Sequence, residues 1–304
     1  MKLAYYPGCS GMGTSAEYER STRAVCKALG IELQDLPDWS CCGSTPAHAT
    51  DAVLSAALSA RNLTIAAKTM AQSGATKFTT PCPSCLLNLK TARHHMAEPE
   101  FRAKVDAILD EPCPPIGQKG EEPLPDTYSV LQLLVEDYGL ENIKSKVKTP
   151  LKGLKIAPYY GCLLSRPPKI MQFDDPENPT SMDRLLEALG AEVVPFPLKT
   201  ECCGASMGIP RRDITERLSG RLIETAVRYG ADMIAVACPL CHMNLDLRQE
   251  QAARAKNAVF DMPVLYFTQL MGIALGLKES DLGLNKLCVS PTQALQKIGK
   301  EVSA

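Results

Sequence analysis

Ten of the thirteen cysteines in this 304-residue chain fall into one pattern that occurs twice. Each copy has a single cysteine, then a Cys-Cys-Gly triplet, then a Cys-Pro-x-Cys segment. The two copies are Cys9, Cys41, Cys42, Cys82 and Cys85, and Cys162, Cys202, Cys203, Cys238 and Cys241. A conventional 4Fe–4S cluster or a structural zinc ion takes at most four thiolates. The fifth thiol of each copy is therefore idle, takes part in chemistry, or belongs to an unconventional cluster.

The segments that precede these cysteines are expected to be β-strands. Short β-branched or aromatic runs predict strands at 2–6, 31–36, 76–80, 155–159, 192–196 and 233–237. Longer helical runs lie between them, at 16–29, 52–70, 181–189 and 213–227. Strands that alternate with such helices form parallel sheets, whose carboxyl edges bind ligands. Each cysteine group follows a strand, so three separate segments bring five thiols to one edge in each half.

Other segments repeat along with the cysteines. Tyr-Tyr-Pro-Gly precedes the first cysteine of copy one, and Tyr-Tyr-Gly precedes that of copy two. Asn88 and Asn244 each come three residues after the last cysteine of their copy. We predict an α/β fold of two pseudo-symmetric repeats, each a small parallel sheet with flanking helices. The expected domains are 1–150, with the first site, and 151–304, with the second. The proline-rich stretch 111–125 is predicted to be an exposed connection.

Composition bounds the remaining function classes. The net charge is −1 and 45% of the residues are hydrophobic, so nothing in the charge balance favours nucleic acid or a membrane surface as a partner. No apolar run approaches the roughly 20 residues that span a bilayer, and the N-terminus lacks the apolar core of a signal peptide. We therefore expect a cytoplasmic protein with no membrane span. In a reducing compartment, clustered cysteines indicate metal binding or catalysis in preference to disulfides.

The cysteine pattern is compatible with two kinds of metal site. Two five-thiol groups in register favour iron–sulfur clusters, and the adjacent cysteines could hold two irons or bridge one thiolate between irons. Zinc in one half remains the alternative, because a tetrahedral site can use any four of the five thiols.

Several residues beside the motifs have both a functional and an ordinary reading. His242 follows Cys241 and could ligate, relay protons or donate to a sulfur, or it could make a simple buried polar contact. A basic set near the second site could receive an anionic substrate or form a solvated surface: Lys169, Lys199, Arg211 and Arg212. Of the cysteines outside the pattern, Cys26 is expected in the core, and Cys113 and Cys288 are expected to be incidental.

The twice-repeated pattern resembles the CCG, or cysteine-rich, domain, and the whole chain resembles the B subunit of heterodisulfide reductases. The resemblance implies that each five-cysteine motif holds a noncubane 4Fe–4S cluster, the first on Cys9, Cys41, Cys42, Cys82 and Cys85 and the second on Cys162, Cys202, Cys203, Cys238 and Cys241. It also implies a multi-subunit complex of anaerobic metabolism, in which the other members are a ferredoxin-like C subunit and a flavin-containing A subunit. The reaction it implies is reductive cleavage of the coenzyme M–coenzyme B disulfide.

Cleaving a disulfide takes two electrons, whereas an iron–sulfur cluster usually delivers one. We therefore expect the two sites to face a shared cleft between the halves, with Cys42, Cys203 and His242 closest to the chemistry. Three alternatives stay open. The chain could be a CCG-domain electron-transfer subunit of a lactate, glycolate or glycerol-3-phosphate oxidising system. It could act on another thiol disulfide or persulfide, or it could be a zinc-stabilised scaffold.

Overall fold

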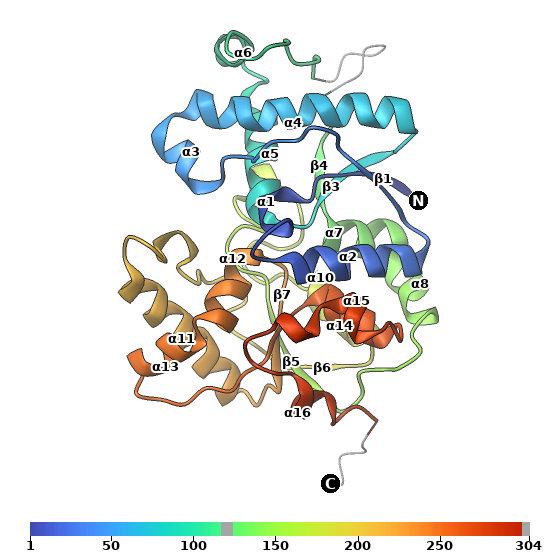
Figure 1. Ribbon diagram of the computed structural model, residues 1–304, viewed down its shortest axis with the longest axis vertical. Helices are drawn as coiled ribbons and strands as arrows, with labels where there is room; N and C mark the ends of the chain where they lie inside the picture. Colours follow the sequence, from blue (N-terminus) through green and yellow to red (C-terminus); the bar gives the residue numbers. More distant parts are fainter. Residues whose placement is uncertain (117–123, 300–304) are drawn as a thin grey trace.

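The structure is a computed structural model that describes residues 1–116 and 124–299. Within those residues the chain forms two four-stranded parallel sheets flanked by helices (Figure 1). This confirms the predicted α/β fold class. Sheet A has the order β2-β1-β3-β4 and sheet B the order β6-β5-β7-β8. The strand bounds are β1 Lys2–Tyr5, β2 Glu32–Asp35, β3 Lys77–Thr80, β4 Thr127–Ser129, β5 Lys155–Tyr159, β6 Glu192–Val193, β7 Met233–Val236 and β8 Val264–Tyr266.

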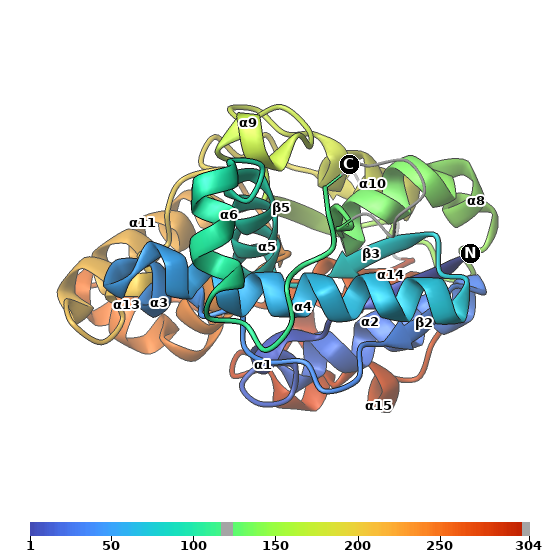
Figure 2. The same cartoon turned by 90° about the horizontal axis from the view of Figure 1, so that it is seen from above.

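The central strands are continuous apolar runs because helices cover both faces of each sheet. All four residues of β7 are buried, and so are the last three of β1 and the last four of β5. Such runs are typical of parallel sheets, which lack a solvated face. The edge strands β2 and β6 are more exposed. Seen from above, the long α4 lies across the sheet A half (Figure 2).

The four long helices predicted from the sequence are present within a few residues of their expected limits: α2 Ala16–Leu29, α4 Ala52–Ser73, α10 Ser181–Ala188 and α11 Arg212–Arg228. Helix α2 ends at Gly30, whose φ of 76° places it in the left-handed conformation that glycine adopts without strain. Thr180 and Ser181, at the start of helix α10, are capped by a side chain from outside the helix. The Asp174 carboxylate, from the preceding loop, accepts the N–H groups of both residues.

The fourth strand of each sheet was not predicted, because three residues are too few to show a period. Each leads directly into helical chain: β4 into α7 Val130–Gln132, the π-helical η1 Leu133–Gly139 and α8 Leu140–Ser145, and β8 into α14 Phe267–Ala274. The other elements are α1 Gly8–Gly11, α3 Ser44–Thr50, α5 Pro83–His95, α6 Pro99–Asp106, α9 Pro168–Met171, η2 Ala205–Met207, α12 Pro239–His242, η3 Met243–Leu247, α13 Gln249–Ala255, α15 Glu279–Leu282, η4 Leu284–Lys286 and α16 Thr292–Leu295.

The two halves exchange helix contacts reciprocally. Helix α2 of the first half packs on α14 and α15 of the second, while α10 of the second half packs on α7 and α8 of the first. These helices lie between the two sheets in Figure 1. The buried hydroxyls of Ser21 and Thr268 are 2.7 Å apart across this contact. One apolar core cluster accordingly contains residues from both halves.

The proline-rich stretch and Cys26 can be compared with what the sequence predicted. Of the proline-rich stretch 111–125, residues 117–123 lie outside the described residues, and Cys113 within the described part is buried beside Thr64. Cys26 is a core residue, as expected. None of the helices in the described ranges is both long and apolar enough to cross a membrane.

Candidate metal centres

The first cysteine site gathers thiols from three segments after strands of sheet A. Cys9 lies in the short α1 after β1, Cys41 and Cys42 lie in the loop after β2, and Cys82 and Cys85 begin α5 after β3. The Sγ atoms of Cys42 and Cys85 are 3.4 Å apart. Those of Cys41 and Cys9 are 3.7 Å apart.

The second site repeats this construction on sheet B. Cys162 follows β5, Cys202 and Cys203 follow β6, and Cys238 and Cys241 lie at the start of α12. The Sγ atoms of Cys203 and Cys241 are 3.5 Å apart. The sites therefore match not only in sequence but also in one close pair of sulfurs, formed by the second cysteine of the Cys-Cys pair and the last cysteine of the motif.

Each site is buried on one side and open on the other. The closely spaced thiols are buried: Cys42, Cys82, Cys85, Cys203, Cys238 and Cys241. Cys9, Cys41 and Cys202 are exposed, and Cys162 is intermediate. A group held by five thiols would therefore have three ligands in the core and two at the surface, where a small molecule could reach it.

A glycine in each half leaves room for the thiols. Gly8 and Gly161 immediately precede Cys9 and Cys162, and both have φ of +72°. A Cβ added at Gly8 would lie 3.0 Å from Cys85 Sγ, and one at Gly161 would lie 3.0 Å from Cys241 Sγ. A carbon and a sulfur in van der Waals contact need more space than that, so any larger residue would push into the thiol cluster.

The glycines of the two Cys-Cys-Gly triplets act differently. Gly43 and Gly204 do form tight turns, with φ of +83° and +78°. A Cβ at Gly43 would meet Ala47 Cβ at 2.5 Å, and one at Gly204 would meet Thr215 Cα at 2.9 Å. These glycines allow the triplet to pack on the following helix, whereas Gly8 and Gly161 are the ones that face the thiols.

The asparagines that recur in register hold the Cys-Cys turns. Asn88 Nδ2 donates to Cys42 O at 3.2 Å and lies 3.6 Å from Cys42 Sγ. Asn244 Nδ2 makes the same two contacts with Cys203, at 3.4 and 3.5 Å. An amide donor beside a thiolate stabilises its negative charge and tunes the potential of any metal bound there.

Hydrogen bonds between neighbouring cysteines lower the pKa of some thiols and raise that of others. Hydrogen bonds from Cys41 and then Cys85 lower the pKa of Cys42, and the bond to Cys241 lowers that of Cys203. The pKa values of their partners Cys85 and Cys241 are raised, first of all by these same hydrogen bonds. A hydrogen bond from Cys162 lowers the pKa of Cys202 to about 6. Each site thus offers thiolates to a cation without help from lysine or arginine.

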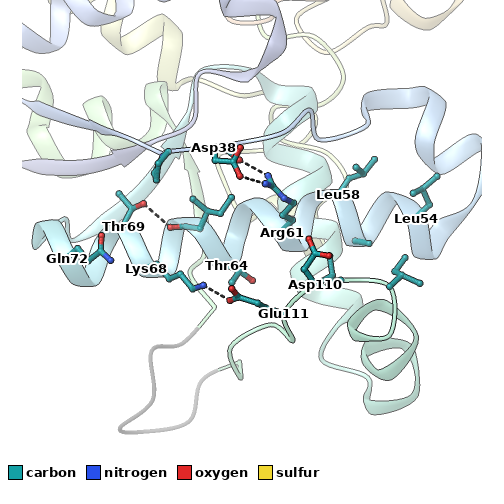
Figure 3. A pocket seen from close by; sticks show the side chains of 15 residues that line it. Asp38, Leu54, Leu58, Arg61, Thr64, Lys68, Thr69, Gln72, Asp110 and Glu111 are labelled. Carbon is teal, nitrogen blue, oxygen red and sulfur yellow. Dashed lines mark hydrogen bonds and ion pairs between the residues drawn. The ribbon is translucent and has the colours of Figure 1, made fainter.

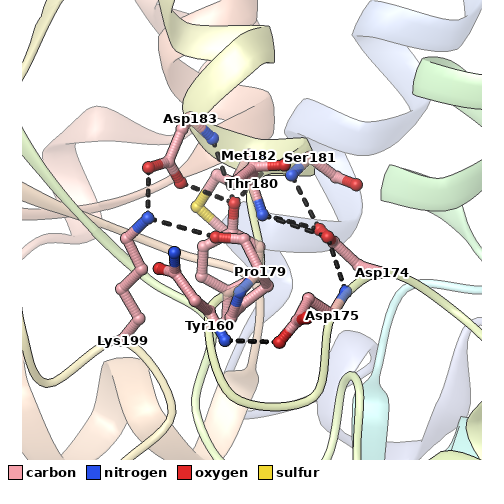
Figure 4. A network of polar contacts seen from close by, with 10 residues as sticks. Tyr160, Asp174, Asp175, Pro179, Thr180, Ser181, Met182, Asp183 and Lys199 are labelled. Atoms are coloured by element: carbon pink, nitrogen blue, oxygen red, sulfur yellow. Dashed lines mark hydrogen bonds and ion pairs between the residues drawn. The ribbon is translucent and has the colours of Figure 1, made fainter.

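The predicted basic set is largely engaged elsewhere. Lys199 Nζ pairs with Asp183 and donates to Pro179 O at 3.1 Å, in a network with Tyr160 and Asp174 (Figure 4). The Lys199 carbonyl accepts the N–H groups of Tyr160 and Gly161 at 2.9 and 3.0 Å, so this residue ties the Cys162 turn to the chain before Cys202.

The other three cations of that set are exposed. Arg211 pairs with Asp213 and Arg212 with Glu216, while Lys169 lies in α9. The structure therefore gives Lys199 a positioning role rather than that of a free anion receptor.

His242 is buried at the contact between the halves. Its Nε2 is 3.0 Å from Val264 O, which can only accept, so this nitrogen carries the proton. Its Nδ1 lies 3.9 Å from Glu17 Oε1, a buried carboxyl that α2 of the first half supplies. Burial lowers the pKa of His242 and raises that of Glu17, so the neutral imidazole is favoured. His242 does not reach out to the exposed thiols.

One residue lies between the two sites. Tyr18, in α2, is buried, and its hydroxyl donates to Pro81 O, the carbonyl just before Cys82, at 3.1 Å. Burial raises the pKa of Tyr18, and the Cys82 and Cys238 thiols raise it further. Cysteines of both sites are thus near this one hydroxyl. Sequence reasoning missed Tyr18, because no local pattern indicates that α2 crosses to the other half.

The residues present fit a metal cluster better than a single ion. No three His, Cys, Asp or Glu side chains within the described ranges are arranged to hold one metal ion. Five thiols, a glycine that leaves them space and an amide donor beside them nevertheless recur in both halves, which is the donor set that iron–sulfur clusters use.

A separate cavity of about 570 Å³ lies on the outer face of α4 (Figure 3). Apolar side chains such as Leu54, Leu58 and Ile108 line it, beside the ion pairs Arg61–Asp38 and Lys68–Glu111. Among its described lining residues there is no cysteine, so it is distinct from both candidate centres.

Comparison with known proteins agrees with the duplicated fold. Residues 3–90 and 156–246 each match the cysteine-rich domain family, CCG. The 8-methylmenaquinol:fumarate reductase membrane anchor subunit of Wolinella succinogenes is 35% identical over 96% of this chain and 98% of its own. The B subunit of the ferredoxin:CoB-CoM heterodisulfide reductase of Methanosarcina mazei is 30% identical over 100% and 98%. An Archaeoglobus profundus protein, named as similar to the heterodisulfide reductase B subunit, is 32% identical over 98% and 97%.

A solved structure of a hypothetical protein from Helicobacter pylori superimposes with a TM-score of 0.71 at 15% identity. It covers 95% of this chain, which spans about half (52%) of that protein, and the likeness concerns the fold alone.

Fold and sites together define a duplicated α/β protein with one five-cysteine site per half. The chain belongs to the cysteine-rich CCG domain family, of which it has two copies, and it is similar over its whole length to heterodisulfide reductase B subunits. The resemblance predicted from the sequence is confirmed.

Proposed function

We propose that this chain is the catalytic iron–sulfur subunit of a heterodisulfide reductase-type complex. The observation that carries the proposal is the pair of matching five-thiol sites, one per half, with Tyr18 lying near cysteines of both. The full-length relatives from Methanosarcina mazei and Archaeoglobus profundus, which are named for this activity, support it. Residues 1–150 and 151–304 are proposed to act as two domains, each holding one site.

The proposed ligands are the ten motif cysteines, five to each noncubane 4Fe–4S cluster. Such clusters would supply electrons one at a time, two in all, to a bound disulfide. The overall reaction balances as R–S–S–R′ plus two electrons and two protons, giving two thiols. The protein's own part is to keep three thiols of each site in the core and to leave the Cys41 and Cys202 side open to the substrate.

The smaller assignments follow from these contacts. Gly8 and Gly161 keep space beside Cys85 and Cys241, and the two asparagines stabilise negative charge on Cys42 and Cys203. His242 is proposed to support the second site from behind. The expected partners are two further subunits, one ferredoxin-like and the other flavin-containing, and the expected compartment is the cytoplasm. A disulfide of the coenzyme M–coenzyme B type, or a related thiol disulfide, is the proposed substrate.

Anaerobic purification followed by iron and acid-labile sulfide analysis tests the cofactor. We expect about eight of each per chain, against one or two zinc ions with no iron for a scaffold. Reduced viologen then serves as donor for candidate disulfides, with thiol release as the readout. Cys42→Ser and Cys203→Ser should abolish turnover, whereas Cys113→Ser, a buried thiol outside the motifs, should not. Full activity from a chain that has lost one whole centre would refute the two-centre mechanism.

A second function is favoured by a specific finding, the 35% identity to a subunit of an 8-methylmenaquinol:fumarate reductase. In that case the two centres would carry electrons between a quinol-reactive partner and a fumarate-reducing partner. This is a variant of the electron-conduit role among the alternatives from the sequence. Co-purification with neighbouring subunits distinguishes the two roles. Menaquinol analogue oxidation coupled to fumarate reduction, with no disulfide turnover, would favour the conduit.

A further inference from the structure

Three aromatic rings form a buried column at the contact between the halves. The ring of Tyr18 is stacked on that of Tyr266, with centroids 4.0 Å apart and planes 3° from parallel. The other face of Tyr266 is occupied by His242, with centroids 4.4 Å apart and planes 18° from parallel. All three side chains are almost fully buried. Tyr18 belongs to the first half, and Tyr266 and His242 belong to the second.

This column connects the two cysteine sites without a gap. At one end, the Tyr18 hydroxyl is hydrogen-bonded to the carbonyl of Pro81, which is bonded to Cys82. At the other end, His242 is bonded to Cys241. Between these ends there are only two ring-to-ring contacts. Tyr266 is held in place by Gln269, whose Oε1 accepts the Tyr266 N–H at 2.9 Å.

The column is not a product of the duplication. The register of the Cys-Pro-x-Cys motifs places Leu86 where His242 stands in the other half. Strand pairing places Ser129 opposite Thr80, as Tyr266 stands opposite Val236. The second half thus supplies two aromatic rings, Tyr266 and His242, at positions where the first half has Ser129 and Leu86. The pair lies beside Tyr18, whose hydroxyl is hydrogen-bonded to the carbonyl just before Cys82 of the first site.

We propose that Tyr18, Tyr266 and His242 are the route by which the two cysteine sites exchange electrons. The inference rests on the proposed function, because it requires redox-active iron at both sites. In each exchange one electron leaves the reduced site and enters the oxidised one. No bond forms or breaks, and the rings are neither oxidised nor reduced. Electron exchange favours bonded and closely packed paths, and the path between these sites consists of covalent bonds, one hydrogen bond and two ring-to-ring contacts.

The route gives the chain a way to pool electrons. A donor protein that docks on one half can then fill both sites, although it reaches only one. Two electrons become available together for a two-electron substrate. Tyr18 and Tyr266 are therefore positioning residues for this exchange and do not touch the substrate.

The test compares matched variants of the anaerobically purified full chain. Tyr18→Leu and Tyr266→Leu each remove a ring from the column. Tyr266→Phe keeps the ring, and Tyr18→Phe keeps the ring but loses the bond to Pro81. Phe267→Leu is the packing control, because Phe267 contacts Tyr18 edge-on at 6.1 Å and lies outside the column.

All variants and their parent carry Cys9→Ser. This substitution replaces one thiolate of the first site by an oxygen ligand and so gives that site an EPR spectrum distinct from that of the second. Each chain is mixed with half an equivalent of dithionite and frozen at intervals. EPR then follows how the electron redistributes between the two signals.

We expect Tyr18→Leu and Tyr266→Leu to slow redistribution relative to the parent, with iron content unchanged. Tyr266→Phe and Phe267→Leu should redistribute at the parental rate, and Tyr18→Phe should fall between. Parental rates in both leucine variants, or equal slowing by Phe267→Leu, would overturn the route. If the parent binds no iron, the proposed function itself fails, and iron analysis reveals this before any kinetics are recorded.

Discussion

Replacing Gly8 or Gly161 by alanine tests whether the thiols need the space that these glycines leave. Both residues precede the first cysteine of their copy, and both have φ of +72°. The new methyl group would lie 3.0 Å from the Sγ of Cys85 or of Cys241. Each substitution should therefore disturb one site and leave the other intact.

The effect of each substitution has two parts, a backbone strain and a steric contact with the sulfur. A non-glycine residue in the left-handed region costs about 1–2 kcal/mol, which lowers the midpoint of thermal unfolding by about 2–8 °C for a unit of this size. The second part is steric: the added methyl group crowds the Sγ of Cys85 or Cys241 and should disturb the metal site. Gly74 and Gly230 isolate the first part, because their φ values are +72° and +73° and an added Cβ would meet nothing within 4 Å.

The assay is iron and sulfide content per chain, together with thermal unfolding of the metal-free form. Gly8→Ala and Gly74→Ala should be destabilised similarly as metal-free chains, but only Gly8→Ala should lose about half the iron. Gly161→Ala and Gly230→Ala form the same comparison for the second site. If Gly8→Ala keeps its full iron content, or if Gly74→Ala loses as much, the steric reasoning is wrong.

Three further predictions concern other contacts. Lys199→Met should destabilise the chain by about 3 kcal/mol in urea unfolding, since it removes the cation that pairs with the largely buried Asp183 carboxylate; a loss below about 1 kcal/mol would mean that the pair behaves as an exposed one. A double-mutant cycle of Tyr18→Leu and Tyr266→Leu in the metal-free chain should give a coupling of about 0.5–1.5 kcal/mol, and additive effects would argue against the stack. In the reduced, metal-free chain Cys202, with a pKa of about 6, is a thiol below that pH and a thiolate above it. Iodoacetamide should therefore label it at pH 7 well before the exposed Cys288, whose pKa is raised, and mass spectrometry of equal labelling would contradict this order.

The sequence predicted those helices and strands whose residue patterns lie within a single segment of the chain. Helices α2 and α4 were predicted as longer helical runs between the expected strands, and the first three strands of each sheet as short β-branched or aromatic runs. The fourth strands escaped because β4 and β8 are three residues long and are defined by pairing with β3 and β7. The need for glycine at position 43 also depends on packing, because Ala47 and not a cysteine makes the close contact there.

The sequence by itself determined the number and grouping of the thiols and the edge of each sheet where they lie. That much follows from covalent order, since a residue just after a parallel strand must emerge at the carboxyl edge. Only the tertiary structure decided which thiols are buried, that Lys199 is tied to the Cys162 turn, and that Tyr18 meets Tyr266. These features depend on residues far apart in the chain, and Tyr18 meets Tyr266 because α2 packs against the opposite half. No spacing rule within one segment encodes such a crossing.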